Sequence, residues 1–137
     1  MRNRRNERGA AAVEFALVFP LVIMLLLTVI EFSRLWNVQA TISDAARISA
    51  RYAAVHGNDP LADEADVIAE ATDRAKAVPG LVDWSTATIS VSIDCDAEDG
   101  IATSTISVAP GSITQWFGSA IGTPITLEGK GVMTCGG

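Results

Sequence analysis

The chain has 137 residues, 49% of them hydrophobic, and a formal net charge of −6. This charge is unevenly placed, because four arginines and one glutamate give residues 1–9 a charge of +3 and leave −9 on the remainder. An acidic body repels the phosphates of DNA and RNA, so we exclude a nucleic-acid partner. Beyond the apolar N-terminal segment about 105 residues remain, which is enough for one modest hydrophobic core.

The most apolar part of the chain lies directly behind this basic start. Residues 15–30 contain no charged side chain, and the stretch from Ala10 to Ile30 is interrupted only by Glu14. About 20 apolar residues are enough to span a bilayer as a helix. Basic residues precede the segment and acidic residues follow it, so the positive-inside rule places the N-terminus in the cytoplasm and the C-terminal domain outside. The sequence therefore predicts a single-pass membrane protein of type II orientation.

A cleaved secretory signal is the main alternative for this segment, because a basic start and an apolar run are also its marks. The apolar run is longer than the hydrophobic region of a typical signal. Residues 31–36, which follow it, contain no small-residue cleavage site of the A-x-A kind. We therefore expect the apolar helix to stay attached to the domain.

Helical periodicity continues beyond the apolar segment. Apolar residues recur at steps of three and four, with charged residues between them. They are Leu35, Val38, Ile42, Ala45, Ile48, Tyr52 and Val55. We expect one helix from about Ala12 to Val55, ending near His56, where Gly57 begins a turn. Pro20 lies inside this helix, lacks an amide hydrogen and crowds the preceding turn, so we expect a helix kink there.

A second helix is predicted after this turn. Asp59 is placed to cap it and Pro60 to occupy its first position. Its expected apolar stripe consists of Leu61, Ala65, Ile68, Ala71 and Ala75. Acidic residues in its first turns suit the positive end of the helix dipole.

Three strands are predicted in the C-terminal part. Apolar and polar residues alternate over residues 86–93, a second strand covers about 102–109, and a third begins at Ile125. The expected fold class is α+β, in which a long N-terminal transmembrane helix continues into a small domain with a second helix and a three-stranded antiparallel sheet. The expected divisions are 1–9 as a cationic leader, 10–32 as the transmembrane helix, 33–56 as its extramembrane continuation, and 57–137 as the extracytoplasmic α/β domain.

The loop between the last two predicted strands carries two adjacent aromatic residues, Trp116 and Phe117. An exposed aromatic pair marks a contact site. The alternative is that the pair fills the core beneath the loop.

The two cysteines, Cys95 and Cys135, both fall on the inward parity of their strands. Two inward-facing cysteines outside the cytoplasm favour a disulfide. The alternative is two separate buried thiols. A zinc site is disfavoured, because two cysteines and the single histidine cannot supply four ligands.

The motifs of common catalytic sites are missing from the sequence. It contains no Gly-rich phosphate loop, no G-x-S-x-G, no H-E-x-x-H and no C-x-x-C. A serine relay would need His56, which lies at an expected helix end. We therefore expect no enzymatic activity, no cofactor and no metal.

The junction between the leader and the apolar helix has features of a proteolytic processing site. Gly9 and Ala10 offer a protease small side chains at the cleavage point. Cutting there creates a new amine at Ala10, four positions before Glu14. A carboxylate at membrane depth needs a partner, and an ammonium group from the same or a neighbouring subunit supplies one. The alternative is that Glu14 only reaches toward the interface, favoured by the helix dipole.

These same residues carry a resemblance. Residues 8–15, followed by the apolar run with Pro20, look like the G-x-x-x-x-E-F processing motif of type IV prepilins. Residues 31–35 and 44–53 resemble the TadE-like pseudopilins of the tight-adherence (Flp) pilus system. The resemblance is strong over about residues 8–56 and faint from Ile125 onward.

The resemblance implies a minor, pilin-like subunit that acts in pilus assembly and surface adhesion. It implies cleavage between Gly9 and Ala10 by prepilin peptidase, with Glu14 as the acid used in processing or assembly. The implied partners are other pilin and pseudopilin subunits, contacted through the N-terminal helix, and inner-membrane assembly proteins of the pilus. The implied location is the bacterial cytoplasmic membrane, and the pilus after processing. The main alternative is an uncleaved type II membrane-anchored extracytoplasmic binding module that uses the Trp116 and Phe117 loop. A third possibility is a secreted enzyme released by signal peptidase.

Overall fold

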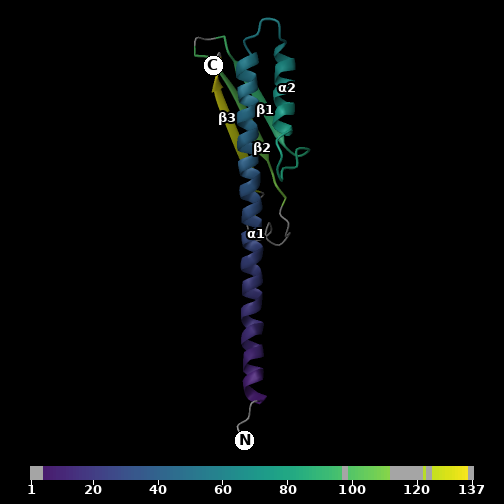
Figure 1. Cartoon of the computed structure of the whole chain (residues 1–137), viewed down its shortest axis with the longest axis vertical. Coiled ribbons are helices and arrows are strands. Elements are labelled where there is room, and N and C mark those ends of the chain that lie inside the picture. Colours follow the sequence, from purple (N-terminus) through teal and green to yellow (C-terminus); the bar gives the residue numbers. More distant parts are fainter. Residues whose placement is uncertain (1–4, 97–98, 112–121, 123–124, 136–137) are drawn as a thin grey trace. The chain divides into compact units, whose positions relative to one another are not determined.

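The computed structural model of the chain describes residues 5–96, 99–111, 122 and 125–135. The described residues form two helices and three strands, whose labels are shown in Figure 1. The elements in chain order are α1 (Arg5–His56), α2 (Glu64–Lys76), β1 (Thr88–Asp94), β2 (Ile101–Val108) and β3 (Leu127–Thr134). The predicted α+β fold class is confirmed. The chain divides into two compact units, residues 1–33 and 34–137, and α1 contributes to both.

The described residues of the first unit form the proximal part of α1, up to Ser33. We call residues 34–56 the distal part of α1. This helix begins at Arg5, earlier than the predicted start near Ala12, and it is continuous through Pro20. The kink expected at Pro20 stays a prediction. The large apolar side chains of this unit are exposed except for Leu27, which is half-buried; Phe15 is 66% exposed and Leu25 64%. Among the described residues, one helical stretch, Gly9–His56, is long and apolar enough to cross a membrane.

The second unit contains the sheet, whose strand order is β1-β2-β3 and whose neighbours are all antiparallel. Ala102 of β2 pairs with Ile93 of β1 on one side and with Met133 of β3 on the other. This register places odd positions of β1 and β3 and even positions of β2 on one face. That face is the more buried one, as the alternation of apolar residues predicted.

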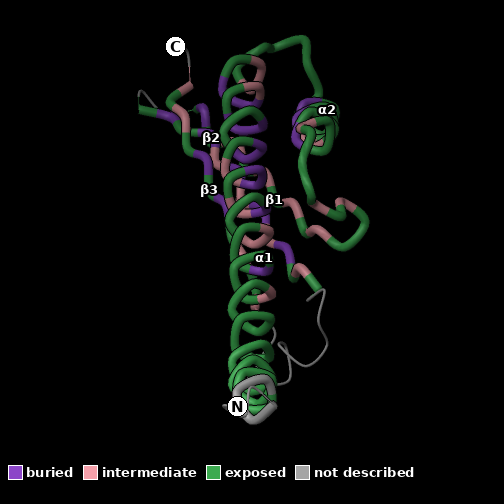
Figure 2. The backbone as a smooth tube through the Cα atoms, turned by 60° about the horizontal axis from the view of Figure 1, so that its bottom comes forward, coloured by how far each residue is buried: buried purple, intermediate pink, exposed green. Residues whose placement is uncertain are grey.

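Small side chains line the contact between the distal part of α1 and the sheet. The fully buried residues of this part of α1 are mostly alanines, and buried positions concentrate in the portion beside the strands (Figure 2). They are Ala45, Ala46, Ala50 and Ala53, together with Val38, Ile42 and Ser49. A Cβ atom added to Gly131 of β3 would lie 2.3 Å from the carbonyl oxygen of Ala46, and one added to Gly129 would lie 2.6 Å from that of Ile42. Glycine at both positions therefore lets the backbones of α1 and β3 touch.

Two hydroxyl groups lie in this close-packed region. Ser49 of α1 and Ser104 of β2 are both 0% exposed. Their Oγ atoms have no hydrogen-bond partner within the part of the chain that the structure describes. A buried hydroxyl without a partner costs about 1–3 kcal/mol, so hydrogen bonding does not explain serine at these positions. The small volume of serine does, because both side chains lie in the close-packed region between α1 and the sheet.

Helix α2 differs from the prediction in its start and in its buried stripe. Its N-cap is Asp63, whose Oδ1 accepts a hydrogen bond from the amide of Ala65 at 3.0 Å. Asp59, the predicted cap, instead accepts from the amide of Leu61 at 3.0 Å and closes a separate turn. Leu61 is consequently outside the helix and 94% exposed. The later start selects a different stripe, and the buried residues of α2 are Val67, Ala71 and Ala75.

The strands follow the predictions to within two residues at their ends, where pairing fades first. Strand β2 ends at Val108, close to the predicted end near residue 109. Strand β3 begins at Leu127 and not at Ile125, because pairing with β2 begins where Leu127 meets Val108.

Replacement of Gly131 by alanine tests the contact between α1 and β3. The added methyl group would force the two backbones apart, and we expect a loss of about 2–3 kcal/mol in the free energy of unfolding. Thermal denaturation of the full chain measures it. Gly111→Ala is the matched control, because nothing lies within 4 Å of a Cβ atom at Gly111. Equal stability of the two variants would contradict the close contact.

Candidate functional site

The expected processing site lies in the first turns of α1. Gly9 and Ala10 are both exposed, and a Cβ atom added to Gly9 would meet nothing within 4 Å. The bond between them is helical, because α1 begins at Arg5. A protease cleaves an extended peptide bond, so this turn must unwind before cleavage. Glycine weakens a helix and terminal turns fray, so the end of α1 near Gly9 opens more readily than its centre.

Glu14 lies one helical turn beyond Ala10 on the same side of α1, at a spacing of four residues. The rise over four residues is about 6 Å. Glu14 is exposed, as are the apolar side chains that follow it. An amine at residue 10 and the Glu14 carboxylate are therefore close enough along the axis for pairing within one helix or between adjacent helices.

The two cysteines form a disulfide that joins the ends of β1 and β3. The Cα atoms of Cys95 and Cys135 lie 5.5 Å apart, and the bond closes a loop with a sequence separation of 40. The amide of Cys135 also donates to the carbonyl oxygen of Gly100 at 2.8 Å. Gly57, at the end of α1, lies against this bridge, since a Cβ atom there would be 3.2 Å from Sγ of Cys95. The predicted pairing of the cysteines is confirmed in the structure.

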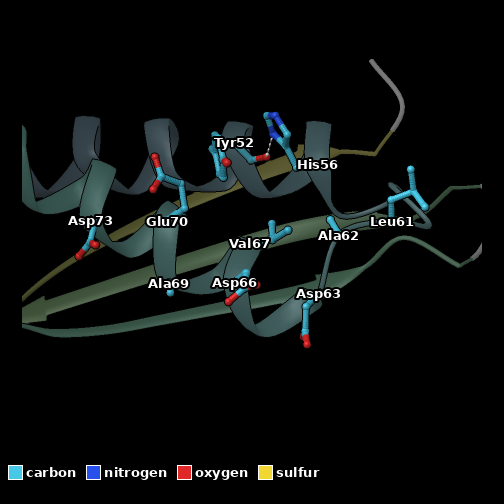
Figure 3. Close-up of a pocket in the computed structure, with 10 residues that line it drawn as sticks. All are labelled: Tyr52, His56, Leu61, Ala62, Asp63, Asp66, Val67, Ala69, Glu70 and Asp73. Atoms are coloured by element: carbon cyan, nitrogen blue, oxygen red, sulfur yellow. Dashed lines mark hydrogen bonds between the residues drawn. The ribbon is translucent and has the colours of Figure 1, made fainter.

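A hollow with a volume of about 510 Å³ lies between the end of α1 and α2 (Figure 3). Tyr52 and His56 border it from α1, with their rings stacked at a centroid distance of 4.1 Å. Arg74 lies over the Tyr52 ring at 4.3 Å and forms an ion pair with Glu70 at 3.0 Å. The acidic residues lining the hollow are Asp63, Asp66, Glu70 and Asp73.

This aromatic and cationic stack joins α1 to α2. His56 Nδ1 lies 3.0 Å from the carbonyl oxygen of Tyr52, so the imidazole is held by its own helix. Sequence reasoning assigned His56 to a helix end and missed the stack with Tyr52. The spacing of four residues between the two rings was the available signal. Within the described part of the chain, no group of three or more His, Cys, Asp or Glu residues is placed to hold a metal ion.

A second hollow, with a volume of about 170 Å³, lies at the other end of the domain. Arg34 and Asp83 are among the residues that line it, and the Arg34 guanidinium donates to the carbonyl oxygen of Gly111. The hydroxyl and the amide of Ser85 both donate to Asp83, at 2.6 Å and 3.0 Å, and these bonds lower the pKa of the Asp83 carboxyl. Asp83 thus stays charged in an exposed turn. Trp116 and Phe117, the predicted contact loop, lie outside the described residues.

The chain carries an apolar helix of membrane-spanning length, and the distal part of the same helix forms one layer of a small α+β domain. The family model described as TadE-like protein matches residues 9–51. This match confirms the resemblance noted in the sequence over that part of the chain. No curated protein and no solved structure matches the chain.

Replacement of Cys95 by serine tests the disulfide. Loss of a bridge that closes a loop of 40 residues costs about 3–4 kcal/mol in the chain-entropy account. We expect Cys95→Ser to melt at a lower temperature than the wild type under oxidising conditions. The difference should largely disappear in reductant, because the wild type then loses the same bond. An equal difference in both conditions would show that packing of the sulfur, and not the bond, is responsible.

Proposed function

We propose that the protein is a minor pilin-like subunit of a tight-adherence (Flp) pilus, cleaved between Gly9 and Ala10 by prepilin peptidase, and that it acts in pilus assembly and surface adhesion. The observation that carries this proposal is the TadE-like family match, which begins at Gly9 and runs to residue 51. The matched segment contains the cleavage point, the acid at Glu14, the apolar helix and most of the distal part of α1.

Cleavage changes the electrostatics at the start of the helix. It removes the four leader arginines and creates an ammonium group at Ala10. In lipid, the Glu14 carboxylate is costly until it meets such a charge. Pairing with the ammonium group of a neighbouring subunit fixes the axial position of one helix relative to the next. The leader thus keeps the precursor apart from the assembly, and its loss makes the subunit ready to pack.

The proposed location is the bacterial cytoplasmic membrane, with the N-terminus inside and residues 34–137 outside. The basic leader and acidic domain support this orientation through the positive-inside rule. The Cys95–Cys135 disulfide also supports it, because such bonds persist outside the reducing cytoplasm. The proposed partners are other pilin and pseudopilin subunits, the peptidase, and inner-membrane assembly proteins of the pilus.

The role we propose is an interaction role and not an enzymatic one. The single histidine of the chain is stacked on Tyr52 and held by its own helix backbone. The apolar helix and the small-residue core both serve packing. The proposal therefore needs neither a cofactor nor a metal.

One observation favours a second candidate function, that of an uncleaved membrane-anchored binding module. The bond between Gly9 and Ala10 lies within α1, and a protease must first unwind this turn. If the turn stays helical at the peptidase, the leader stays on the chain. The protein then remains anchored, with its domain outside the membrane.

The mature mass of the chain separates the two candidates. We expect the protein purified from its host to lack residues 1–9 and to begin at Ala10. Gly9→Val, which places a branched side chain at the cleavage point, should leave the leader attached, while the control Val13→Ala should be cleaved normally. Intact-mass analysis reads both results. A wild-type chain that retains its leader would rule out processing and favour the anchored module.

The role of Glu14 is tested separately from cleavage. Glu14→Ala and the isosteric, neutral Glu14→Gln should both keep the domain folded and reduce incorporation into pili by about tenfold, because both lack the charge that pairs with the new amine. Incorporation is measured by immunoblotting sheared pili against the membrane fraction. Normal incorporation of Glu14→Gln with its leader removed would show that the charge is not needed.

A further inference from the structure

The loop between α2 and β1 is held against the first turns of the distal part of α1. The amide of Leu81 donates to Oδ1 of Asn37 at 3.3 Å, and a Cβ atom added to Gly80 would lie 2.3 Å from Oγ1 of Thr41. Leu81 itself is 62% exposed. Figure 1 shows this loop at the end of the domain where the distal part of α1 begins. An apolar side chain is therefore held in an exposed position at that end of the domain.

The second hollow, of about 170 Å³, lies at the same end and has a charge of each sign in its lining. Arg34 is positioned there by its bond to the carbonyl oxygen of Gly111. Asp83 accepts both bonds from Ser85 on Oδ1, and among the described residues no donor reaches its Oδ2. No ion pair joins Arg34 to Asp83 in the part of the chain that the structure describes. Both charges are therefore available to a ligand.

The depth of this hollow in a membrane follows from the length of the apolar segment. The stretch from Ala10 to Ile30 measures about 30 Å as a helix, which equals the hydrocarbon thickness of a bilayer. Arg34 comes four residues later in the same helix, about 6 Å beyond Ile30. The headgroup layer on each side of a bilayer is about 5–8 Å thick, so Arg34 falls at the depth of the lipid headgroups.

We propose that the second hollow is a binding site for the headgroup of a zwitterionic phospholipid that carries a primary amine, such as phosphatidylethanolamine. The Arg34 guanidinium binds the lipid phosphate, and the Asp83 carboxylate binds the lipid ammonium group. The exposed Leu81 side chain lies against the apolar part of the same lipid. This inference rests on the proposed membrane orientation, in which residues 34–137 lie outside the cytoplasm.

The charges of the hollow select this class of lipid. A guanidinium group binds phosphate through directed, charge-assisted hydrogen bonds, and a neighbouring carboxylate repels a headgroup that is only anionic. The bonds from the hydroxyl and the amide of Ser85 lower the pKa of the Asp83 carboxyl, which keeps it charged. A primary ammonium group donates hydrogen bonds to a carboxylate, whereas the quaternary ammonium group of phosphatidylcholine has no hydrogen to donate.

The rest of the lining and the size of the hollow suit an amphiphilic ligand. Sites for small molecules combine a mainly apolar lining with a few polar groups that fix the orientation of the ligand. Most other residues that line this hollow are apolar, namely Val38, Leu81, Val82, Val108, Ala109 and Pro110. Its volume of about 170 Å³ compares with about 30 Å³ for one water molecule in the liquid, which leaves room for a small headgroup.

Native mass spectrometry of the full chain in detergent micelles tests the recognition of the amine. The two probes are phosphatidylethanolamine and phosphatidylcholine with identical acyl chains, which differ only in methylation of the amine. We expect the ethanolamine lipid to give about tenfold more one-to-one adduct, because only its ammonium group donates hydrogen bonds to Asp83. Equal adducts of the two lipids, or no adduct of either, would overturn the proposal.

Charge variants separate the two halves of the site. Asp83→Asn keeps the oxygen that accepts from Ser85, and it should lower the ethanolamine adduct about tenfold, to the level of the choline adduct. Arg34→Gln should lower the adducts of both lipids, because both carry the phosphate. Asp44→Asn and Arg47→Gln are the matched controls, since that exposed ion pair does not line the hollow. An unchanged ethanolamine adduct in Asp83→Asn, or equal losses in the control variants, would overturn the site.

Spin labels test the depth of the loop without altering either charge. Leu81→Cys carries a nitroxide at the proposed lipid contact, and Leu61→Cys carries it at a leucine that follows the end of α1 and is 94% exposed. The native cysteines are already paired. In nanodiscs of the ethanolamine lipid, oxygen should relax the label at residue 81 more strongly than a water-soluble nickel chelate does, and the reverse should hold at residue 61. Equal access of the chelate to both labels would contradict the proposed contact.

Failure of this site and failure of the proposed function give different results. A chain that loses its leader and enters pili but does not prefer the ethanolamine lipid would leave the assembly role standing and remove only the headgroup site. A chain that keeps its leader and still prefers the ethanolamine lipid would support the site on an anchored module.

Discussion

The contact of α1 with β3 is the constraint on which the domain depends. Gly129 and Gly131 allow the strand backbone to lie against the carbonyl oxygens of Ile42 and Ala46. A helix can approach a sheet this closely only where neither surface carries large side chains, and the buried alanines of α1 meet that condition. The same helix carries the apolar segment, so the domain is built directly on the element that anchors it.

Close approach limits how much apolar area such a core buries, since alanine and glycine contribute little of it. The disulfide between Cys95 and Cys135 compensates by holding β1 and β3 together at the end of the sheet near Gly57. The stack of Tyr52, His56 and Arg74 joins α1 to α2 in the same region. The domain thus combines a thin core with a covalent and an aromatic link between its elements.

One side of the distal part of α1 is buried against the sheet, and the other side is exposed. The exposed side carries Asp44, followed along the helix by Arg47 and Arg51. The TadE-like family match ends at residue 51, so it covers most of this exposed side but none of the sheet. Helix α2 and all three described strands lie outside the matched segment.

The amino-acid sequence by itself determined the order of the elements, the apolar segment, the inward parity of Cys95 and Cys135, and the family resemblance, because each depends on local periodicity or on a short motif. The sequence alone misplaced the start of α2, because Asp59 and Asp63 are both residues that cap helices well. Tertiary packing decides between them by burying Val67. Only the tertiary structure revealed why Gly129 and Gly131 are needed and which side of α1 is open. Those features depend on the contact between α1 and β3, whose residues lie about 85 positions apart in the sequence. Local periodicity does not predict a contact of that separation.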